Sequence, residues 1–202
     1  MTSTLIKITL VTLSIILGGC VAENKADRPE TWSKEAVVSQ DCPDISGIYK
    51  NIGQSHEADF CAMSERGIVP SECVLSVLLE QPWGNLSGYI PASDLAETTV
   101  EIGKIDNGII KVKLLNDGAL RHEFMLGGSG RPYECKGGSI YLADHEAEYP
   151  TYASIHVWGG FALKPCIDGS LSLNYDFKTA GYIILIPFYG RIQRWYRWER
   201  VK

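Results

Sequence analysis

The chain has 202 residues, of which 45% are hydrophobic and 21% are charged. This length fits one domain of roughly 150 residues with an additional segment, and the apolar fraction excludes an intrinsically disordered chain. Six cysteines argue against an ordinary cytosolic protein, and the net charge of −5 argues against nucleic acid as a partner, because binding phosphates requires a basic surface.

Residues 1–19 have the features of a secretion signal that is removed from the mature protein. Lys7 supplies a positive charge, and the ten residues that follow it, 8–17, are apolar. This run is too short to cross a hydrocarbon core, which takes about 20 helical residues. Its length instead fits the apolar region of a signal peptide.

The apolar run ends in Leu17-Gly18-Gly19-Cys20, which resembles the lipobox of bacterial lipoproteins. The resemblance implies cleavage before Cys20, a diacylglycerol on its sulfur and a further acyl chain on the new amine. The alternative is an ordinary signal peptide in which Cys20 has no such role. Lipoproteins kept in the inner membrane carry Asp after the cysteine. Val21 stands there, so the resemblance implies lipid anchoring in the outer membrane, facing the periplasm.

The mature chain divides into residues 20–41, a lipidated cysteine with a flexible tether, and residues 42–202, a single β-rich domain. The tether is predicted from its polar, mixed-charge composition and Pro29. As a random coil it would span about 25 Å.

The remaining five cysteines permit two disulfides and one free thiol, or an intermolecular bond. They contain no C-x-x-C spacing, so neither a redox motif nor a zinc ribbon is indicated. An oxidising periplasm favours disulfides, and we expect Cys61–Cys73 and Cys135–Cys166. The spacing alone does not decide the connectivity.

Short apolar runs and frequent turn signals predict a mainly β domain, either an antiparallel meander sheet or an open half-barrel of about seven to nine strands. The clearest local feature is a hairpin that turns at Asn116-Asp117-Gly118, where Asn and Gly accept a positive φ. A continuously apolar run at residues 182–188 predicts a strand buried on both faces. The predicted strands are 98–105, 109–115, 120–126, 140–143, 155–163, 171–177, 182–188 and 191–201.

One short helix is predicted at residues 71–80, with Ser71 as N-cap, Glu72 in the first turn and Pro82 after the end. A further strand is the alternative for this stretch.

The sequence Cys-Pro-Asp-Ile-Ser-Gly-Ile-Tyr at residues 42–49 resembles the start of the mature domain in small lipoproteins of Gram-negative bacteria. Further short stretches are similar to that group: a Leu-rich helix at 74–79, Cys-x-Gly-Gly at 135–138, Asp-Gly-Ser-Leu at 168–171 and an aromatic-basic strand at 194–198. The resemblance implies a location in the cell envelope and a β-sheet with a helix. It implies no activity, so no functional residue is transferred.

No motif completes a catalytic or metal site. Asp144, His145, Glu146 and Glu148 offer ligands for a cation, but they fit a solvated loop better and lack the second histidine of H-E-x-x-H. We therefore predict no metal and no cofactor. An enzyme would require a cleft that unites His145 or His156 with acids and a nucleophile.

Two strands carry patterns with two interpretations. In residues 191–202, arginines alternate with aromatic residues, which suits either a grip on an anionic glycan or a closing strand whose arginines cover aromatic side chains. In residues 155–163, His156 and Trp158 share one face. That face then holds either a pocket or an ordinary strand histidine.

These features together predict a non-catalytic module that binds a partner in the envelope. The expected partners are the membrane, through the lipid anchor, and an envelope protein or glycan. The alternative is a lipocalin-like carrier in which the sheet encloses a small apolar ligand.

Metabolic labelling with palmitate checks the anchor. We expect the wild-type chain to incorporate the label and Cys20→Ala to lose it, because the thiol that receives the lipid is gone. Labelling that survives this substitution would contradict the lipobox assignment.

Overall fold

The computed structural model describes residues 20–38, 42–57, 59–62, 64, 66–80, 89–95, 97–143, 147–150, 153–183 and 186–201. The predicted signal segment, with Leu17, Gly18 and Gly19 of the lipobox, lies outside these residues, as do Asp144, His145 and Glu146.

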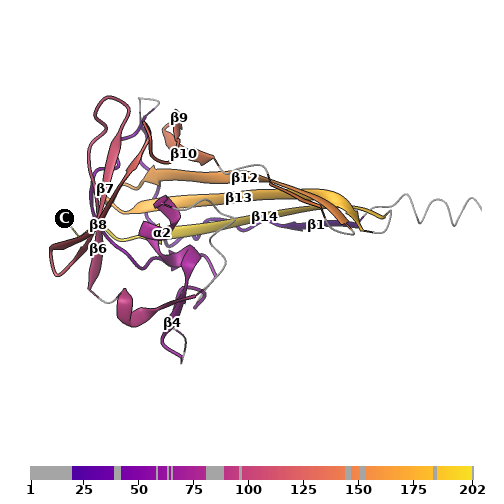
Figure 1. The fold of residues 1–202 in the computed structure, drawn as a ribbon, viewed down its shortest axis with the longest axis horizontal. Coiled ribbons are helices and arrows are strands. Elements are labelled where there is room, and N and C mark those ends of the chain that lie inside the picture. Colours follow the sequence, from indigo (N-terminus) through magenta and orange to yellow (C-terminus); the bar gives the residue numbers. More distant parts are fainter. Residues whose placement is uncertain are drawn as a thin grey trace, which may run out of the picture.

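The largest unit of the fold is an open sheet, which has eight strands in the described part of the chain (Figure 1). Its centre is an antiparallel meander of three long strands, β12 (Ala153–Pro165), β13 (Leu171–Ile183) and β14 (Ile186–Trp198). Shorter strands flank the meander: β9 (Glu134–Lys136), β10 (Ser139–Ala143) and β11 (Ala147–Pro150) on the β12 side, and β1 (Cys20–Asn24) and β3 (Gln54–Ser55) on β14.

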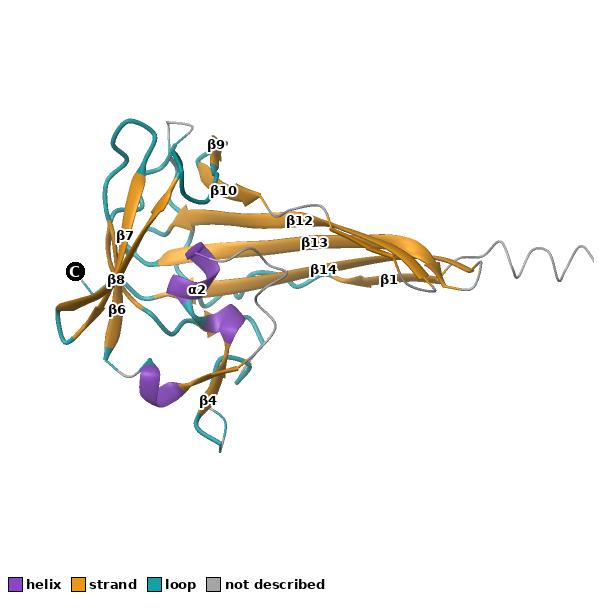
Figure 2. Cartoon of the chain, in the orientation of Figure 1, coloured by secondary structure: helices purple, strands orange, loops and turns teal. Residues whose placement is uncertain are grey.

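A second sheet consists of β2 (Gly47–Lys50), β6 (Thr98–Ile102), β7 (Ile110–Asn116) and β8 (Ala119–Leu126), all antiparallel. The hairpin predicted from Asn116-Asp117-Gly118 joins β7 to β8, and Asp117 and Gly118 both have positive φ angles, 50° and 75°. The remaining elements of the described residues are the strand pair β4 (Ile68–Pro70) and β5 (Tyr89–Pro91) and three helical segments (Figure 2): η1 (Ser71–Cys73), α2 (Leu75–Glu80) and η3 (Ala92–Asp94).

One cluster of buried side chains joins the two sheets to α2. Its largest fully buried members are Trp198, Tyr49, Tyr196 and Phe161. The Tyr49 hydroxyl donates a hydrogen bond of 2.8 Å to the carbonyl of Ile45, and burial raises the pKa of Tyr49 to about 12. The fold is therefore the predicted mainly β architecture with a short helix.

The predicted helix at residues 71–80 forms as a 3₁₀ turn followed by α2. The first amides of α2 are capped from another part of the chain, by Asn51. Its backbone carbonyl accepts a hydrogen bond from the Leu75 amide at 2.8 Å, and its side-chain oxygen accepts one from the Ser76 amide at 2.9 Å. Ser71, the predicted N-cap, is instead the first residue of the 3₁₀ turn.

The prediction of one doubly buried strand at residues 182–188 is wrong. β13 ends at Ile183 and β14 begins at Ile186, so the apolar run crosses from one strand to the next at the end of the large sheet. Tyr182 is 57% exposed and Ile186 is 50% exposed. This end projects away from the second sheet and α2 (Figure 1). We call it the arm, made of β1, residues 153–159 of β12, 178–183 of β13 and 186–191 of β14.

The described residues of the predicted tether follow the large sheet instead of forming a free coil. β1 runs parallel to β14 from Cys20 beside Phe188 to Asn24 beside Ile192. Farther along, the Trp195 indole N–H donates to the carbonyl of Ala26 at 3.0 Å, and Lys164 forms an ion pair of 2.9 Å with Glu35. The segment from Cys20 onward thus leads from the arm back to the rest of the domain.

The disulfides differ from the sequence prediction at one pair. Cys61 is bonded to Cys73, as expected. Cys135 is bonded to Cys42 rather than to Cys166, and Cys166 is a free, buried thiol. The expected Cys135–Cys166 pair is therefore corrected: β9 lies beside the start of the domain, which brings the Cα atoms of Cys42 and Cys135 to 4.7 Å.

Peptide mapping without reduction checks this connectivity. We expect one cross-linked peptide containing Cys42 and Cys135, another containing Cys61 and Cys73, and a Cys166 peptide that alkylates only after unfolding, because burial shields its thiol. A Cys135–Cys166 peptide would contradict the pairing.

Candidate functional site

A groove of about 500 Å³ lies on the face of β12 and β13 that points away from the core. Alternate residues of each strand divide between the two faces. On the inner face of β12, Phe161 and Leu163 are fully buried. The residues on the opposite face of β12, Trp158, Gly160 and Ala162, line the groove.

The floor of the groove is open because it carries small residues between larger ones. Ala162 pairs with Tyr141 on β10 on one side and with Asn174 on β13 on the other. One step along β12, Gly160 pairs with Asp176. A glycine and an alanine in the middle strand therefore leave a depression between the side chains of the two neighbouring strands.

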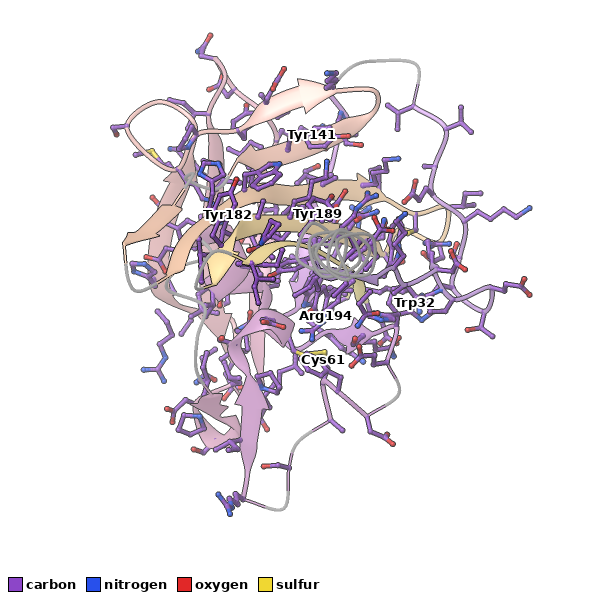
Figure 3. The ribbon with its side chains drawn as sticks, turned by 90° about the vertical axis from the view of Figure 1, so that its right-hand side faces the viewer. Trp32, Cys61, Tyr141, Tyr182, Tyr189 and Arg194 are labelled. Atoms are coloured by element: carbon purple, nitrogen blue, oxygen red, sulfur yellow. A yellow bond between two sulfur atoms is a disulfide. The ribbon has the colours of Figure 1, made fainter. Side chains whose placement is uncertain are left out.

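Two aromatic side chains border this depression. Tyr141 is 40% exposed (Figure 3), and Trp158 is partly exposed with its ring 5.2 Å from that of His156. The Trp158 pocket that alternation suggested is therefore present, with Trp158 in its lining. Tyr141 was not predicted, because its place beside Ala162 depends on how β10 and β12 pair.

The polar wall of the groove is held in place by hydrogen bonds to β14. Arg191 donates two bonds to the carboxylate of Asp176, at 2.8 and 2.6 Å, and Gln193 donates one to the side-chain oxygen of Asn174 at 3.4 Å. The hydrogen bonds and charge of Asp176 raise the pKa of Arg191. Asn174 and Asp176, two of the groove residues on β13, are thus oriented before any ligand arrives.

Further charges line the groove at Glu134, Lys136 and Lys178. In the part of the chain that the structure describes, no ion pair engages Lys136 or Lys178. Since Arg191 already neutralises Asp176, the groove carries an excess of positive charge. Its residues offer ring surfaces, hydrogen-bonding groups and cations, which suits binding of a polar ligand.

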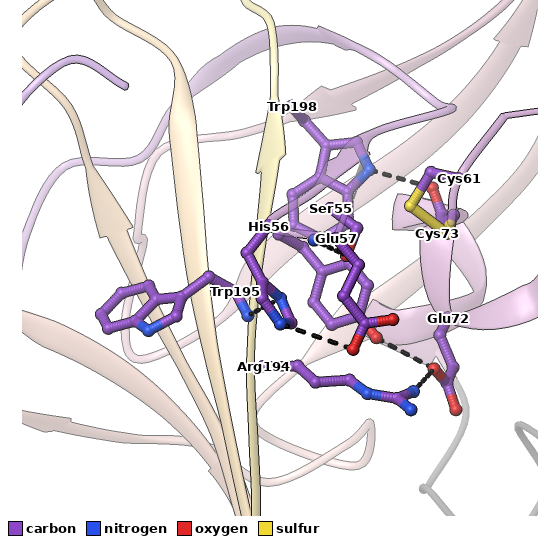
Figure 4. The surroundings of a disulfide bond; sticks show 10 residues. Ser55, His56, Glu57, Cys61, Glu72, Cys73, Arg194, Trp195 and Trp198 are labelled. Atoms are coloured by element: carbon purple, nitrogen blue, oxygen red, sulfur yellow. Dashed lines mark hydrogen bonds and ion pairs between the residues drawn. A yellow bond between two sulfur atoms is a disulfide. The ribbon is translucent and has the colours of Figure 1, made fainter. Parts of the chain in front are cut away.

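A second cluster of polar groups lies beside the Cys61–Cys73 disulfide (Figure 4). Glu72 accepts hydrogen bonds from Arg194 at 2.8 Å and from the Tyr196 hydroxyl at 2.9 Å. Burial, reinforced by Glu72, raises the pKa of Tyr196 well above its usual value. These contacts fasten η1 to β14 and leave the Glu72 carboxylate occupied by the protein itself.

The arginines of the last strand are also held by the protein. Arg191 pairs with Asp176, Arg194 with Glu72, and Arg197 with Asp168 at 2.6 Å. The aromatic residues on the inner face, Tyr196 and Trp198, are fully buried. Of the two interpretations of residues 191–202, these contacts favour the closing strand.

His56 and His122, two described histidines that each precede a glutamate in the sequence, lie in different surroundings. The Trp195 amide donates to His56 Nδ1 at 3.2 Å, with Glu57 3.6 Å from Nε2. His122 instead contacts Glu80, at 2.8 Å. No group of three or more metal-ligating side chains occurs among the described residues.

No family model, curated protein or solved structure matches this chain. In the described residues, no helix has both the length and the apolar character needed to span a membrane.

Substitution of Glu72 tests the cluster beside the disulfide. We expect Glu72→Ala to lower the free energy of unfolding by about 1–3 kcal/mol, because the partly buried Arg194 loses its charged partner. Glu101→Ala, which breaks a more exposed ion pair with Lys113, is the control and should cost at most about 1 kcal/mol. Chemical denaturation measures both, and equal losses would contradict the structural role of Glu72.

Proposed function

We propose that this protein is a lipid-anchored, non-catalytic module on the periplasmic face of the outer membrane that binds an anionic saccharide of the envelope in the groove. The observation that carries the proposal is the lining of the groove. Trp158 and Tyr141 lie there beside fixed hydrogen-bonding groups and beside lysines that form no ion pair with any residue the structure describes.

The chemistry of a sugar ring fits this lining. One face of a pyranose presents C–H groups, which pack on the electron-rich face of an aromatic ring. Its hydroxyls require donors and acceptors in fixed positions, which Asn174 and Asp176 supply because β14 holds them. An acidic group on the sugar would lie near Lys136 and Lys178, whose charges no carboxylate of the described residues neutralises.

The anchor is supported by the lipobox residues and by the course of the chain after them. β1 begins at Cys20, so a lipid on that residue is joined directly to the arm instead of through a free coil. At about 3.3 Å per residue, the ten residues from Phe188 to Trp198 place the far end of β14 about 33 Å from Cys20. The arm then acts as a spacer between the lipid and the rest of the domain.

The lipocalin-like carrier stays a prediction without a supporting observation. Phe161, Tyr196 and Trp198 occupy the inner face of the large sheet where an enclosed ligand would lie. The groove is on the opposite face, and its lining is polar and aromatic.

Saccharide binding is tested with the full mature chain carrying Cys20→Ser, titrated with a galacturonic acid trimer, maltotriose and glucose 6-phosphate. We expect the acidic probes to bind more tightly than maltotriose. Trp158→Ala should weaken binding at least about tenfold, since the ring surface is lost. Ala162→Leu should do the same by filling the floor. Calorimetry gives the affinities.

Trp32→Ala is the matched control, because Trp32 is also a partly exposed tryptophan but does not line the groove. Lys178→Gln should reduce the preference for the acidic probes while leaving maltotriose binding nearly unchanged. The proposal is wrong if no probe binds at millimolar concentration, or if Trp158→Ala and Trp32→Ala bind alike.

A further inference from the structure

The far end of the arm is apolar and almost free of charge. We call this end the tip: residues 20–22, 153–157, 179–183 and 186–190. Besides Cys20, the titratable side chains of the tip are His156, Tyr182 and Tyr189. These ranges contain no lysine, arginine, aspartate or glutamate. Val21 is 71% exposed, Tyr182 57% and Ile186 50%, so this apolar surface is open to the solvent.

On β1, β13 and β14, charged groups begin together at one level of the sheet. Lys178 and Arg191 are directly paired across β13 and β14, and Glu23 of β1 lies opposite Arg191. On the other edge, Glu148 of β11 pairs with His156, two residues nearer the free end than Trp158, the partner of Lys178. Five residues, or about 16 Å of strand, separate Lys178 from Ile183 on β13 and Arg191 from Ile186 on β14. This charge-free section of β13 and β14 is comparable to half the thickness of a hydrocarbon core, about 15 Å.

The proposed lipid attachment lies on this same section. Cys20 pairs with Phe188, which is two residues from the start of β14 at Ile186. Acyl chains on Cys20 would therefore leave the protein beside the exposed apolar side chains. An exposed apolar surface of this kind favours contact with a membrane or another protein, and its continuity with Cys20 favours the membrane.

We propose that the tip inserts into the membrane interface as a second contact beside the acyl chains. Tyr182 and Tyr189 (Figure 3, which looks along the arm from its tip) are aromatic residues with a polar end, the type that prefers the interface. Lys178 and Arg191 then lie at the level of the lipid headgroups. The tip stays at the interface because the edge strands β1 and β11 flank it with unpaired backbone groups, which are costly to bury in hydrocarbon.

This inference rests on the proposed function for the acyl chains, and it adds an orientation to that function. A single lipidated residue on a free coil would let the domain tumble, whereas a tip held at the interface keeps the arm upright. Because Trp158 pairs with Lys178, the groove begins at the level of the headgroups and extends away from them.

Spin labelling of the full acylated chain tests the insertion. Nitroxides are placed at Tyr182→Cys, Ile186→Cys and, as the control, Leu120→Cys, an equally exposed apolar position on β8 of the second sheet. The proteins are reconstituted in vesicles of phosphatidylethanolamine and phosphatidylglycerol, and collision rates with oxygen and with a nickel chelate are compared. We expect oxygen to dominate at 182 and 186 and the chelate to dominate at 120. Equal chelate access at 186 and 120 would overturn the inference.

A second measurement separates this inference from the lipid anchor. The Cys20→Ser chain, which has no acyl chain, is sedimented with the same vesicles. We expect binding that falls at least about tenfold in Tyr182→Ser/Ile186→Ser, because two buried apolar side chains are lost. Leu120→Ser, the control, should leave binding unchanged, and thermal unfolding confirms that each variant is folded.

The outcomes are distinguishable. If mass spectrometry finds no lipid on Cys20 but the Cys20→Ser chain binds vesicles through the tip, the proposed anchor fails and the inference stands. If Cys20 carries lipid but the tip substitutions change nothing, the anchor stands and the inference fails. If the tip substitutions instead convert a dimer to a monomer in gel filtration and leave vesicle binding unchanged, the tip is a contact between two copies of this chain.

Discussion

Burial of Tyr196 and Trp198 at the end of β14 holds the parts of the molecule together. Their rings stack at 6.1 Å, the Trp198 indole N–H donates to the carbonyl of Cys73 at 3.3 Å, and the Tyr196 hydroxyl donates to Glu72. These two side chains thus join the long meander to the 3₁₀ turn and its disulfide. Their neighbours depend on the same packing: a Cβ at Gly53 would lie 2.5 Å from the Trp198 nitrogen.

The large sheet is longer than the core that covers it. In one half of the meander, the inner face packs against the second sheet and α2, and only the outer face meets solvent. In the arm, no second layer is present among the described residues, so both faces are open. This difference accounts for the two features with functional interest: the groove lies on the outer face, and the exposed apolar tip lies at the uncovered end.

The alternation of apolar and polar residues along single strands was the sequence signal that best predicted the structure. It identified the β7–β8 hairpin, whose turn is set by Asp117 and Gly118, and it placed His156 and Trp158 on one face of their strand, which the structure shows to be the face of the groove. Both are local properties, since a period of two residues and a positive φ depend on near neighbours. Tyr141 escaped this reasoning, because its place in the groove depends on its register opposite Ala162.

Composition predicted local structure least well in segments that do not pack against the core in the usual way. Residues 182–188 have the apolar run of a buried strand, yet they cross the uncovered end of the sheet. Residues 20–38 have the composition of a tether, yet β1 pairs with β14 through backbone hydrogen bonds, which carry no side-chain signature. The spacing of the cysteines likewise did not identify the partner of Cys135, because Cys42 comes close only when β9 is in place.

The sequence by itself determined the mainly β class, the hairpins, the helical segment near residues 71–80 and the lipobox-like N-terminus, because each is written in residues close together in the chain. Only the tertiary structure decided which cysteines pair, that the early mature segment follows β14, and that Tyr141, Trp158 and Asp176 border one groove. Those features depend on strand register and on which face the core covers. Both are settled by packing between residues far apart in the sequence.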